Sequence, residues 1–213
     1  MGELVKKLLP FYTVTFIFLL VVTITVFTTD KTEAHLAVNT LHSGWQDFFF
    51  RYYTHLADGL TIVILTFIIS MSFLKRGWLP VLSLGAINLV LVGAIVQSLK
   101  QFVFYDAARP SAFLVNHPFY KVPGVDLHIA NSFPSGHSAA AFAFFSFLAY
   151  LLRDNKFAQI TCAIAAVLAA YSRVYLSQHF LEDILFGSVI GLCCFLIAYL
   201  LLKGWLKRSF ERN

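Results

Sequence analysis

The sequence predicts an all-helical, polytopic integral membrane protein with six transmembrane helices in a single domain, residues 1–213. Hydrophobic residues make up 59% of the chain and charged residues only 13%, which lies outside the range of soluble globular domains. A helix needs roughly 20 mostly apolar residues to cross the hydrocarbon core of a bilayer. Six apolar runs approach this length, and the fourth is the shortest: 11–29, 57–75, 79–99, 137–152, 157–176 and 183–203.

The residues that flank these runs predict the orientation of the chain. In a six-helix arrangement one side carries most of the Lys and Arg residues, at positions 6, 7, 75, 76, 153, 156, 203, 207, 208 and 212. Because Lys and Arg accumulate on the cytoplasmic side, we expect both termini in the cytoplasm. All 7 His residues lie on the opposite side. We therefore expect any chemistry on the periplasmic or outer face of a membrane, with the bacterial inner membrane as the expected location.

The expected partners are the bilayer and a membrane-bound substrate. The first apolar run reaches spanning length without a small-residue cleavage site, so we expect it to remain as a helix rather than act as a signal peptide. A net charge of +5 would also suit nucleic acid, but the basic residues sit in short flanks of apolar runs, which excludes that partner. The oligomeric state stays open.

Between the first two runs, residues of about 41–56 predict an amphipathic helix in the membrane interface. Large apolar residues share one helical stripe, and most polar residues lie opposite: Leu41, Trp45, Phe48, Phe49, Tyr52 and Leu56 against Gln46, Asp47, Arg51 and His55. Such a helix either anchors the bundle through an aromatic belt or offers a platform along which a lipid approaches. His35, His42 and His55 are interpreted as interfacial residues without a chemical role.

The outer segments between the runs have a different character. The segment of about 100–136 is too long for a simple turn and is rich in polar residues, and long ordered loops are commonly functional. It begins with "KQFVFYDAARPS" and ends with "NSFPSGHS", and the next outer turn reads "YSRVYLSQHFLEDILFG". We interpret 100–136 as the catalytic loop.

These three stretches resemble, in the same order, the motifs of the type 2 phosphatidic acid phosphatase superfamily. The matching residues are Lys100, Arg109 and Pro110, then Pro134, Ser135, Gly136 and His137, and then Ser172, Arg173, His179 and Asp183. The resemblance covers nearly the whole chain, and its second and third motifs match residue for residue. The spacing between Lys100 and Arg109 is longer than in the family pattern. On a continuous helix it would place the two cations on opposite faces, so the helix must end near Phe104 if both reach one phosphate.

The residue types suit phosphate chemistry independently of the resemblance. Lys100, Arg109 and Arg173 place cations at the membrane edge, where a charge needs a partner or a function. A phosphate dianion is a natural partner, because Arg can fork across two oxygens while Lys acts as a point charge. Ser135 and Gly136 directly precede an apolar run, so the amides of a helix N-terminus would add donors to the same phosphate. Ser135 could equally be an ordinary N-cap.

Two histidines and a carboxylate suggest the reaction. His179 and Asp183 lie four residues apart, so within a helix they share one face, and the carboxylate can orient Nε2 of His179 for attack. His179 is thus the candidate nucleophile, forming a phosphohistidine, and His137 is the candidate general acid. We expect no metal site, because these His and Asp residues are taken up by phosphate chemistry. The resemblance also implies metal-independent hydrolysis.

The leading hypothesis is a membrane lipid phosphatase without a cofactor, acting on undecaprenyl pyrophosphate, phosphatidylglycerophosphate or phosphatidate. A lipid A phosphatase, or a phosphotransferase that passes the phosphoryl group to another lipid, is the enzymatic alternative, and a soluble phosphate ester could use the same site. A transporter or scaffold is disfavoured, because the runs carry almost no charge at depth. The soluble vanadium haloperoxidases share these motifs but lack six apolar runs. Lys121, His117 and His128 are possible headgroup contacts in the loop.

Overall fold

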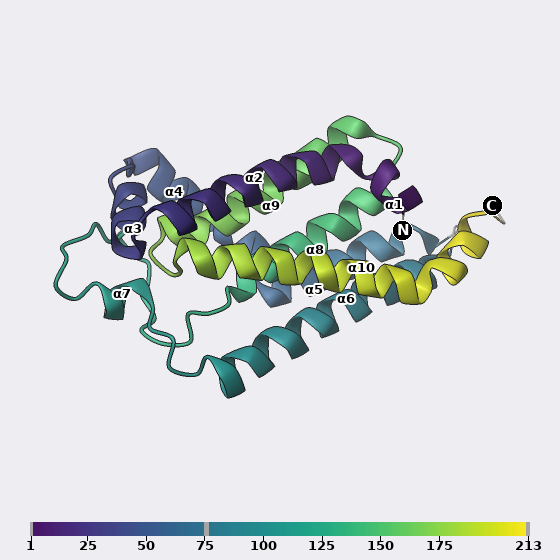
Figure 1. The fold of residues 1–213 in the computed structure, drawn as a ribbon. Coiled ribbons are helices and arrows are strands. Elements are labelled where there is room, and N and C mark those ends of the chain that lie inside the picture. Colours follow the sequence, from purple (N-terminus) through teal and green to yellow (C-terminus); the bar gives the residue numbers. More distant parts are fainter. Residues whose placement is uncertain (1, 75–76, 212–213) are drawn as a thin grey trace.

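The computed structural model describes residues 2–74 and 77–211, and within these ranges all regular structure is helical. The elements follow one another as α1 (Gly2–Lys7), α2 (Leu9–Thr28), α3 (Lys31–Asn39), α4 (Gly44–Tyr53), the 3₁₀ helix η1 (Thr54–Ala57), α5 (Gly59–Met71), α6 (Trp78–Ser98), the π-helix η3 (Leu99–Val103), α7 (Pro110–Phe113), α8 (Gly136–Leu151), α9 (Lys156–Tyr175) and α10 (Leu181–Glu211), as Figure 1 shows. The predicted all-helical class is confirmed.

Four helical segments are long and apolar enough to cross a membrane: Leu9–Thr28, Trp78–Val103, Lys156–Tyr175 and Leu181–Ser209. A fifth crossing is possible if Gly44–Ala57 and Gly59–Met71, which meet at 63°, form one broken segment. Helix α8 is apolar but has only 16 residues. Each of the six predicted runs thus contains a helix, while helix length alone supports four crossings. Predicted positions 75, 76 and 212 lie outside the described residues.

Helix α8 runs through the middle of the bundle and packs against α6, α9 and α10 (Figure 1). Most of its residues are buried, and they are largely Ala and Phe. The side chain of Asn88 on α6 makes a hydrogen bond to α8, because its Nδ2 donates to the carbonyl oxygen of Ala143 at 2.8 Å. Since other helices cover α8, it forms the core of the bundle.

Two glycines of α10 bring its first half close to α8. A Cβ atom at Gly187 would overlap the carbonyl oxygen of Ser135, and one at Gly191 would overlap that of Ala139. Glycine is needed at such a contact because small residues let two helix backbones approach closely. The approach places the N-terminal ends of α8 and α10 side by side, and the predicted site residues lie at these ends.

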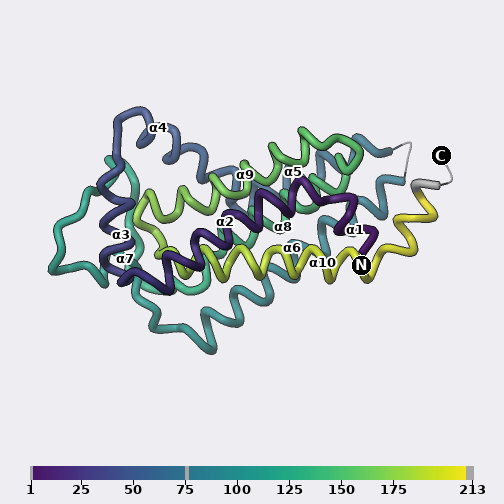
Figure 2. The backbone as a smooth tube through the Cα atoms, turned by 45° about the horizontal axis from the view of Figure 1, so that its top comes forward, coloured from purple at the N-terminus to yellow at the C-terminus, as the bar shows by residue number. Residues whose placement is uncertain are grey.

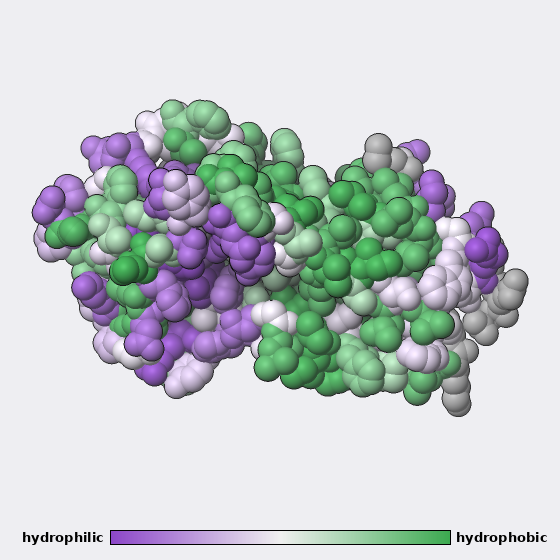
Figure 3. Space-filling model, turned by 90° about the horizontal axis from the view of Figure 1, so that it is seen from below, coloured by the Kyte–Doolittle hydropathy of each residue, from purple (hydrophilic) through white to green (hydrophobic). Residues whose placement is uncertain are grey.

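The bundle has two polar ends separated by an apolar middle. Helices α3, α4 and α7 gather at one end, and α1 and the end of α10 lie together at the other (Figure 2). Figure 3 shows the hydrophobic side chains collected between these ends. The predicted amphipathic helix forms as α4 followed by η1, and Trp45, Phe48 and Tyr52 on it are exposed. Such a distribution suits a protein surrounded by lipid.

Candidate active site

The predicted nucleophile, His179, lies in the tight turn between α9 and α10. The backbone amides of Gln178 and His179 both donate to the carbonyl oxygen of Arg173, at 2.9 and 3.0 Å. The side chain of His179 is buried, with 1% of the residue exposed, and its Nδ1 lies 3.2 Å from Oδ2 of Asp183. If Nδ1 carries the ring proton toward this carboxylate, Nε2 is left as the basic nitrogen.

Asp183, in the first turn of α10, is held by donors on several sides. Its Oδ2 accepts hydrogen bonds from Ser132 Oγ at 2.5 Å and from the amide of Phe180 at 2.9 Å, in addition to its contact with His179. Because α10 begins only at Leu181, the histidine precedes the helix instead of sharing a helical face with Asp183. The predicted pair forms nonetheless, because the turn folds His179 back over the start of the helix.

The surroundings of His179 keep its imidazole neutral. Burial lowers the pKa of His179 well below its ordinary value, and the positive charges of Arg173, Arg109 and Lys100, with His137 nearby, lower it further. A neutral imidazole retains the lone pair that a nucleophile requires. The same cations that depress this pKa would be compensated by a bound phosphate.

Arg109 is buried and fixed by backbone carbonyl groups of the outer loop and of the α9–α10 turn. Its Nε donates to Ala130 at 2.8 Å and its Nη1 donates to Gln178 at 2.9 Å. Nη1 also lies 3.4 Å from Nε2 of His179. The guanidinium is thus placed beside the free nitrogen of the histidine, where it can bind an anion that this nitrogen attacks.

Arg173, in the last turn of α9, is the second buried guanidinium. Its Nη1 donates to Thr54 Oγ1 at 2.7 Å, and its Nε has no hydrogen-bond partner. Across residues 2–74 and 77–211, neither Arg109 nor Arg173 lies within ion-pair distance of a carboxylate. Buried charges are costly without a counter-charge, so the two arginines leave a place for an anionic ligand.

Lys100 lies in η3, a π-helical turn that continues α6. The amide of Phe104 donates to the carbonyl oxygen of Leu99 at 2.8 Å, a bond across five residues that widens the turn. The helix ends there, as expected if both cations are to reach one phosphate. Nζ of Lys100 donates to the carbonyl oxygen of Asn131 at 2.8 Å, and Nη2 of Arg109 lies 3.5 Å from the same oxygen. The long spacing therefore does not separate the two cations.

The Ser135–His137 turn begins α8 and connects it to α10. Ser135 is the N-cap, because its Oγ accepts from the amide of Ser138 at 3.3 Å, and its own amide donates to the carbonyl oxygen of Asp183 at 3.0 Å. Gly136 and His137 form the first turn of the helix. Nε2 of His137 lies 2.6 Å from Oδ1 of Asp58, a residue between η1 and α5.

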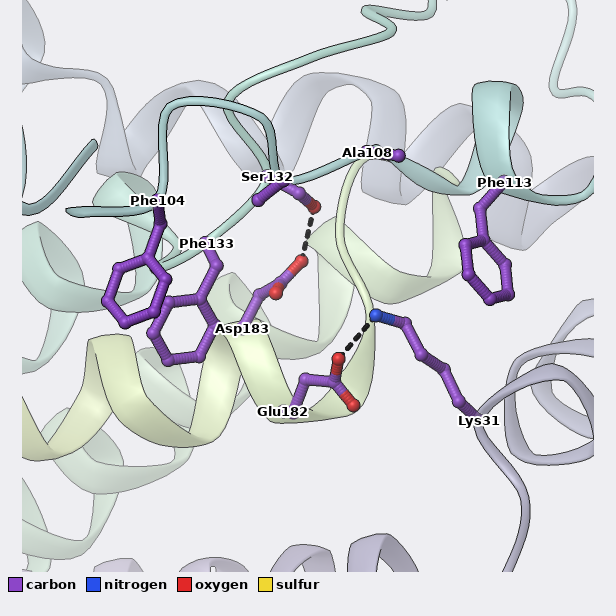
Figure 4. A pocket seen from close by; sticks show the side chains of 9 residues that line it. Lys31, Phe104, Ala108, Phe113, Ser132, Phe133, Glu182 and Asp183 are labelled. Carbon is purple, nitrogen blue, oxygen red and sulfur yellow. Dashed lines mark hydrogen bonds and ion pairs between the residues drawn. The ribbon is translucent and has the colours of Figure 1, made fainter. Parts of the chain in front are cut away.

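A cavity of about 410 Å³ lies beside Asp183 (Figure 4). Its walls are mostly apolar, with an ion pair between Lys31 and Glu182 at one edge. The lining residues are Lys31, Phe104, Ala107, Ala108, Phe113, Ser132, Phe133, Glu182 and Asp183. Of the predicted site residues, only Asp183 faces this cavity.

Several residues that shape the site were not assigned from the sequence. Thr54 in η1 contacts Arg173, and Asp58, directly after η1, contacts His137. The sequence indicated this role only weakly, because Asp58 lies three residues after His55 and directly before an apolar run. Three more residues form hydrogen bonds to predicted site residues: Ser132 to Asp183, Gln178 to Arg109, and Asn131 to Lys100.

The other histidines and the loop lysine divide into two groups. The interpretation of His35 as interfacial was wrong, because α3 folds over the α9–α10 turn and buries it, with Nε2 at 3.1 Å from Ser177 Oγ. His42 is also largely buried, against Asp47. The possible headgroup contacts in the loop are exposed: His117, Lys121 and His128. Among the described residues, no group of three or more His, Cys, Asp or Glu could hold a metal ion.

The fold and the site together define a class: helical membrane proteins with basic and histidine side chains gathered between the ends of their helices. The family model of the PAP2 superfamily matches residues 80–207, a range that holds all predicted site residues, and the chain belongs to this superfamily.

Individual relatives agree with this assignment. Phosphatidylglycerophosphatase B of Bacillus subtilis (strain 168) is 38% identical over 82 residues, which cover 35% of this chain and 38% of that protein. The match therefore spans less than half the length of this relative.

Two crystal structures share the fold over most of the chain. Aquifex aeolicus LpxE has a TM-score of 0.66 and 25% identity, covering 81% of this chain and 97% of that one. A transmembrane PAP2 type phosphatidylglycerolphosphate phosphatase from Bacillus subtilis has a TM-score of 0.59 and 25% identity, covering 91% and 94%.

Proposed function

We propose that this protein is an integral membrane lipid phosphatase that hydrolyses a lipid phosphomonoester or pyrophosphate through a phosphohistidine intermediate, without a metal. One observation carries the proposal. Nε2 of His179 lies 3.4 Å from the guanidinium of Arg109, while Nδ1 of the same ring is held by Asp183. A buried, oriented imidazole beside a cation that lacks a counter-ion is the arrangement that attack on a bound phosphate requires.

In the first step, Nε2 of His179 attacks phosphorus and the bond from phosphorus to the lipid oxygen breaks. His137 gives its proton to that oxygen, so the lipid leaves as an alcohol, or as a lipid phosphate if the substrate is a pyrophosphate. Asp183 accepts the Nδ1–H of His179 throughout, which stabilises the positive charge that develops on the ring. The product of this step is phosphohistidine at residue 179.

In the second step, water replaces the histidine. His137, now neutral, takes a proton from water as the water oxygen attacks phosphorus, and the bond between phosphorus and Nε2 breaks. Inorganic phosphate leaves, and both histidines return to their initial protonation states. One water is consumed for each phosphate released.

The cations stabilise the transferring phosphoryl group in both steps. Arg109 and Arg173 are positioned by the loop and by Thr54, and Lys100 by Asn131. The charge of the phosphoryl group is spread over its equatorial oxygens in the transition state, and fixed donors around these oxygens lower the barrier. The amides at the start of α8 add further donors behind Ser135 and Gly136.

We propose six membrane crossings, with both termini in the cytoplasm and the site at the periplasmic or outer face of a bacterial inner membrane. The distribution of Lys and Arg along the sequence supports this orientation. The site lies at the bundle end that holds α3, away from the two termini (Figure 2). Helices α5 and α8, with 13 and 16 residues, are shorter than a full crossing. Helix α5 can complete its crossing together with α4 and η1 across the bend at Asp58. Helix α8 can be shorter because the surrounding helices cover it.

The location of the site supports a lipid as the substrate. A phosphate held between helix ends at the membrane surface leaves the rest of the molecule next to the apolar middle of the bundle (Figure 3). The names of two relatives make phosphatidylglycerophosphate the first lipid to test. Undecaprenyl pyrophosphate, phosphatidate and lipid A present the same phosphate chemistry.

The test is phosphate release by the purified protein in detergent with EDTA present. Wild type and His179→Ala are compared on phosphatidylglycerophosphate, undecaprenyl pyrophosphate, phosphatidate, lipid A and glucose 6-phosphate. We expect release from at least one lipid that depends on His179 and persists in EDTA. Release from glucose 6-phosphate alone would refute the lipid assignment. Release that is equal in His179→Ala would refute the mechanism.

A phosphotransferase remains the second candidate, because the same phosphohistidine could pass its phosphoryl group to another lipid. Rapid acid-sensitive labelling of the protein by a radiolabelled lipid phosphate, without release of phosphate, would favour it. Addition of candidate acceptor lipids would then restore turnover. Labelling that decays to inorganic phosphate in buffer supports the hydrolase.

A further inference from the structure

The bend between η1 and α5 brings a carboxylate to the predicted general acid. Oδ1 of Asp58 lies 2.6 Å from Nε2 of His137, and Oδ2 of the same carboxylate lies 2.7 Å from Nδ1 of His55. Four residues earlier, Thr54 accepts a hydrogen bond from Arg173. One short segment thus holds two residues of the site from outside the three sequence motifs.

The carboxylate of Asp58 has no competing structural task. Asp58 occupies the N-cap position of α5, but its side chain makes no capping hydrogen bond. Both of its oxygens are instead directed to imidazole rings, one from α8 and one from η1. The Asp58 side chain thus contacts His55, three residues away, and His137 from a distant helix in place of the amides of its own helix.

The charges around His137 make this carboxylate important. Burial of the ring is the largest influence against its protonated form, Arg173 on α9 and Arg109 in the outer loop act in the same sense, and Asp58 acts in the opposite sense. Cations close to an imidazole disfavour its protonated form, and a carboxylate favours it. His179 lies on the far side of the reacting phosphate in the proposed mechanism and is itself neutral. Asp58 is therefore the carboxylate that favours a proton on His137 against burial and these cations.

We propose that Asp58 is a positioning residue for the general acid: it holds Nε2–H of His137, so that Nδ1 is the nitrogen that exchanges protons with the substrate. The inference rests on the proposed function. Asp58 fixes the ring through one nitrogen, and an imidazole has only one other nitrogen with which to act. His55 orients the second oxygen of the carboxylate in turn.

The proton balance of the two steps follows. As the bond between phosphorus and the lipid oxygen breaks, Nδ1–H of His137 gives its proton to that oxygen, and Nε2–H remains bonded to Asp58. In the second step Nδ1 takes a proton from water while the water oxygen bonds to phosphorus and Nε2 of His179 leaves. The charge of Asp58 does not change in either step.

The inference predicts a dependence on the leaving group. An alkyl alcohol is a poor leaving group that needs the proton, whereas a nitrophenolate leaves readily without one. Loss of Asp58 should therefore slow hydrolysis of an alkyl phosphate far more than hydrolysis of an aryl phosphate with an equally long tail. A purely structural defect would lower both rates together.

The experiment compares wild type, Asp58→Asn and Asp58→Glu on this pair of substrates. Asn is as good an N-cap as Asp, so the helix start is preserved. We expect Asp58→Asn to lower kcat on the alkyl phosphate by about 10- to 100-fold and on the aryl phosphate by less than about 3-fold. Asp58→Glu, which keeps the charge but displaces it, should show the same bias to a smaller extent. If Asp58→Asn does not purify as a folded protein, the comparison of Asp58→Glu with wild type on the same two substrates replaces it.

Two further variants separate this inference from the proposed function. Asp154→Asn, the same change at an exposed residue between α8 and α9, should leave both rates unchanged. In a His137→Gln background, Asp58→Asn should add no further loss, because its target is gone. Equal losses on both substrates, or no loss on either, would overturn the role of Asp58 while His179-dependent release upholds the phosphatase. Absence of any His179-dependent release would overturn the proposed function itself.

Discussion

Replacement of Asp183 by Asn tests the core of the proposed mechanism. The carboxylate is buried, and its Oδ2 contacts His179 Nδ1, the Phe180 amide and Ser132 Oγ. An Asn side chain has nearly the same shape but presents one amide nitrogen to a site built from donors. If that nitrogen donates to Nδ1, the ring proton moves to Nε2 and the attacking lone pair is lost. We expect kcat to fall about 10³- to 10⁴-fold, which corresponds to about 4 to 5.5 kcal/mol in the barrier.

The assay is the initial rate of phosphate release at saturating lipid, with thermal unfolding in the same detergent as a check on the fold. Asp154→Asn is the matched control, because it makes the same chemical change at an exposed position between α8 and α9, at the opposite end of the bundle. We expect the control to retain the wild-type rate. If Asp183→Asn keeps more than a tenth of the wild-type kcat, the carboxylate does not set the protonation of His179 and the reasoning fails.

Three further predictions concern the other elements of the site and the bundle. Lys100→Ala should lower kcat by about 10- to 100-fold if Nζ turns from Asn131 to the phosphate, and an unchanged rate of phosphate release would assign that stabilisation to the arginines. Burial lowers the pKa of His35 to about 4, so the folded state holds this ring neutral and loses stability as the pH falls below the ordinary value of about 6.5. His35→Gln should therefore reduce the loss of the free energy of unfolding between about pH 6.5 and 4 by at most about 1.4 kcal/mol per pH unit. The melting temperature of the variant should fall less steeply with pH than that of the wild type, and identical pH profiles would contradict this. Gly191→Leu should lower the melting temperature strongly, since overpacking costs about 1–3 kcal/mol or more, whereas Gly204→Ala, which meets open space, should be tolerated; equal melting temperatures would disprove the close contact of α10 with α8.

Much of the architecture could be predicted from the sequence, because hydrophobic runs are a local property. The predicted run 11–29 corresponds to α2, and 157–176 corresponds to α9 within one residue at each end. The run 57–75 was predicted too long, because α5 begins only after the bend at Asp58 and ends at Met71. Amphipathic periodicity also located α4. Which of these helices cross the bilayer depends on their environment, and the sequence alone could only offer six candidates.

Part of the candidate site was also accessible from the sequence. The motif residues were recognisable by type and order, and the structure brings His179, Asp183 and Arg109 together. The uncertainty about Lys100 had a physical origin, because helix geometry alone could not say whether the helix continues past Phe104. In the structure the helix ends in a π-helical turn at Val103, and no short-range pattern in the sequence predicted this turn.

By itself, the sequence determined the chemical types that this protein carries: apolar helices, three cations, two histidines and a carboxylate in motif order. Only the tertiary structure decided which groups hold them in place. Thr54 and Asp58 are far in sequence from Arg173 and His137, and they meet because η1 and the bend after it pack against the start of α8 and the end of α9. Contacts between distant segments depend on packing, such as the glycine-mediated approach of α10 to α8, and packing is a property of the whole chain that no single stretch encodes.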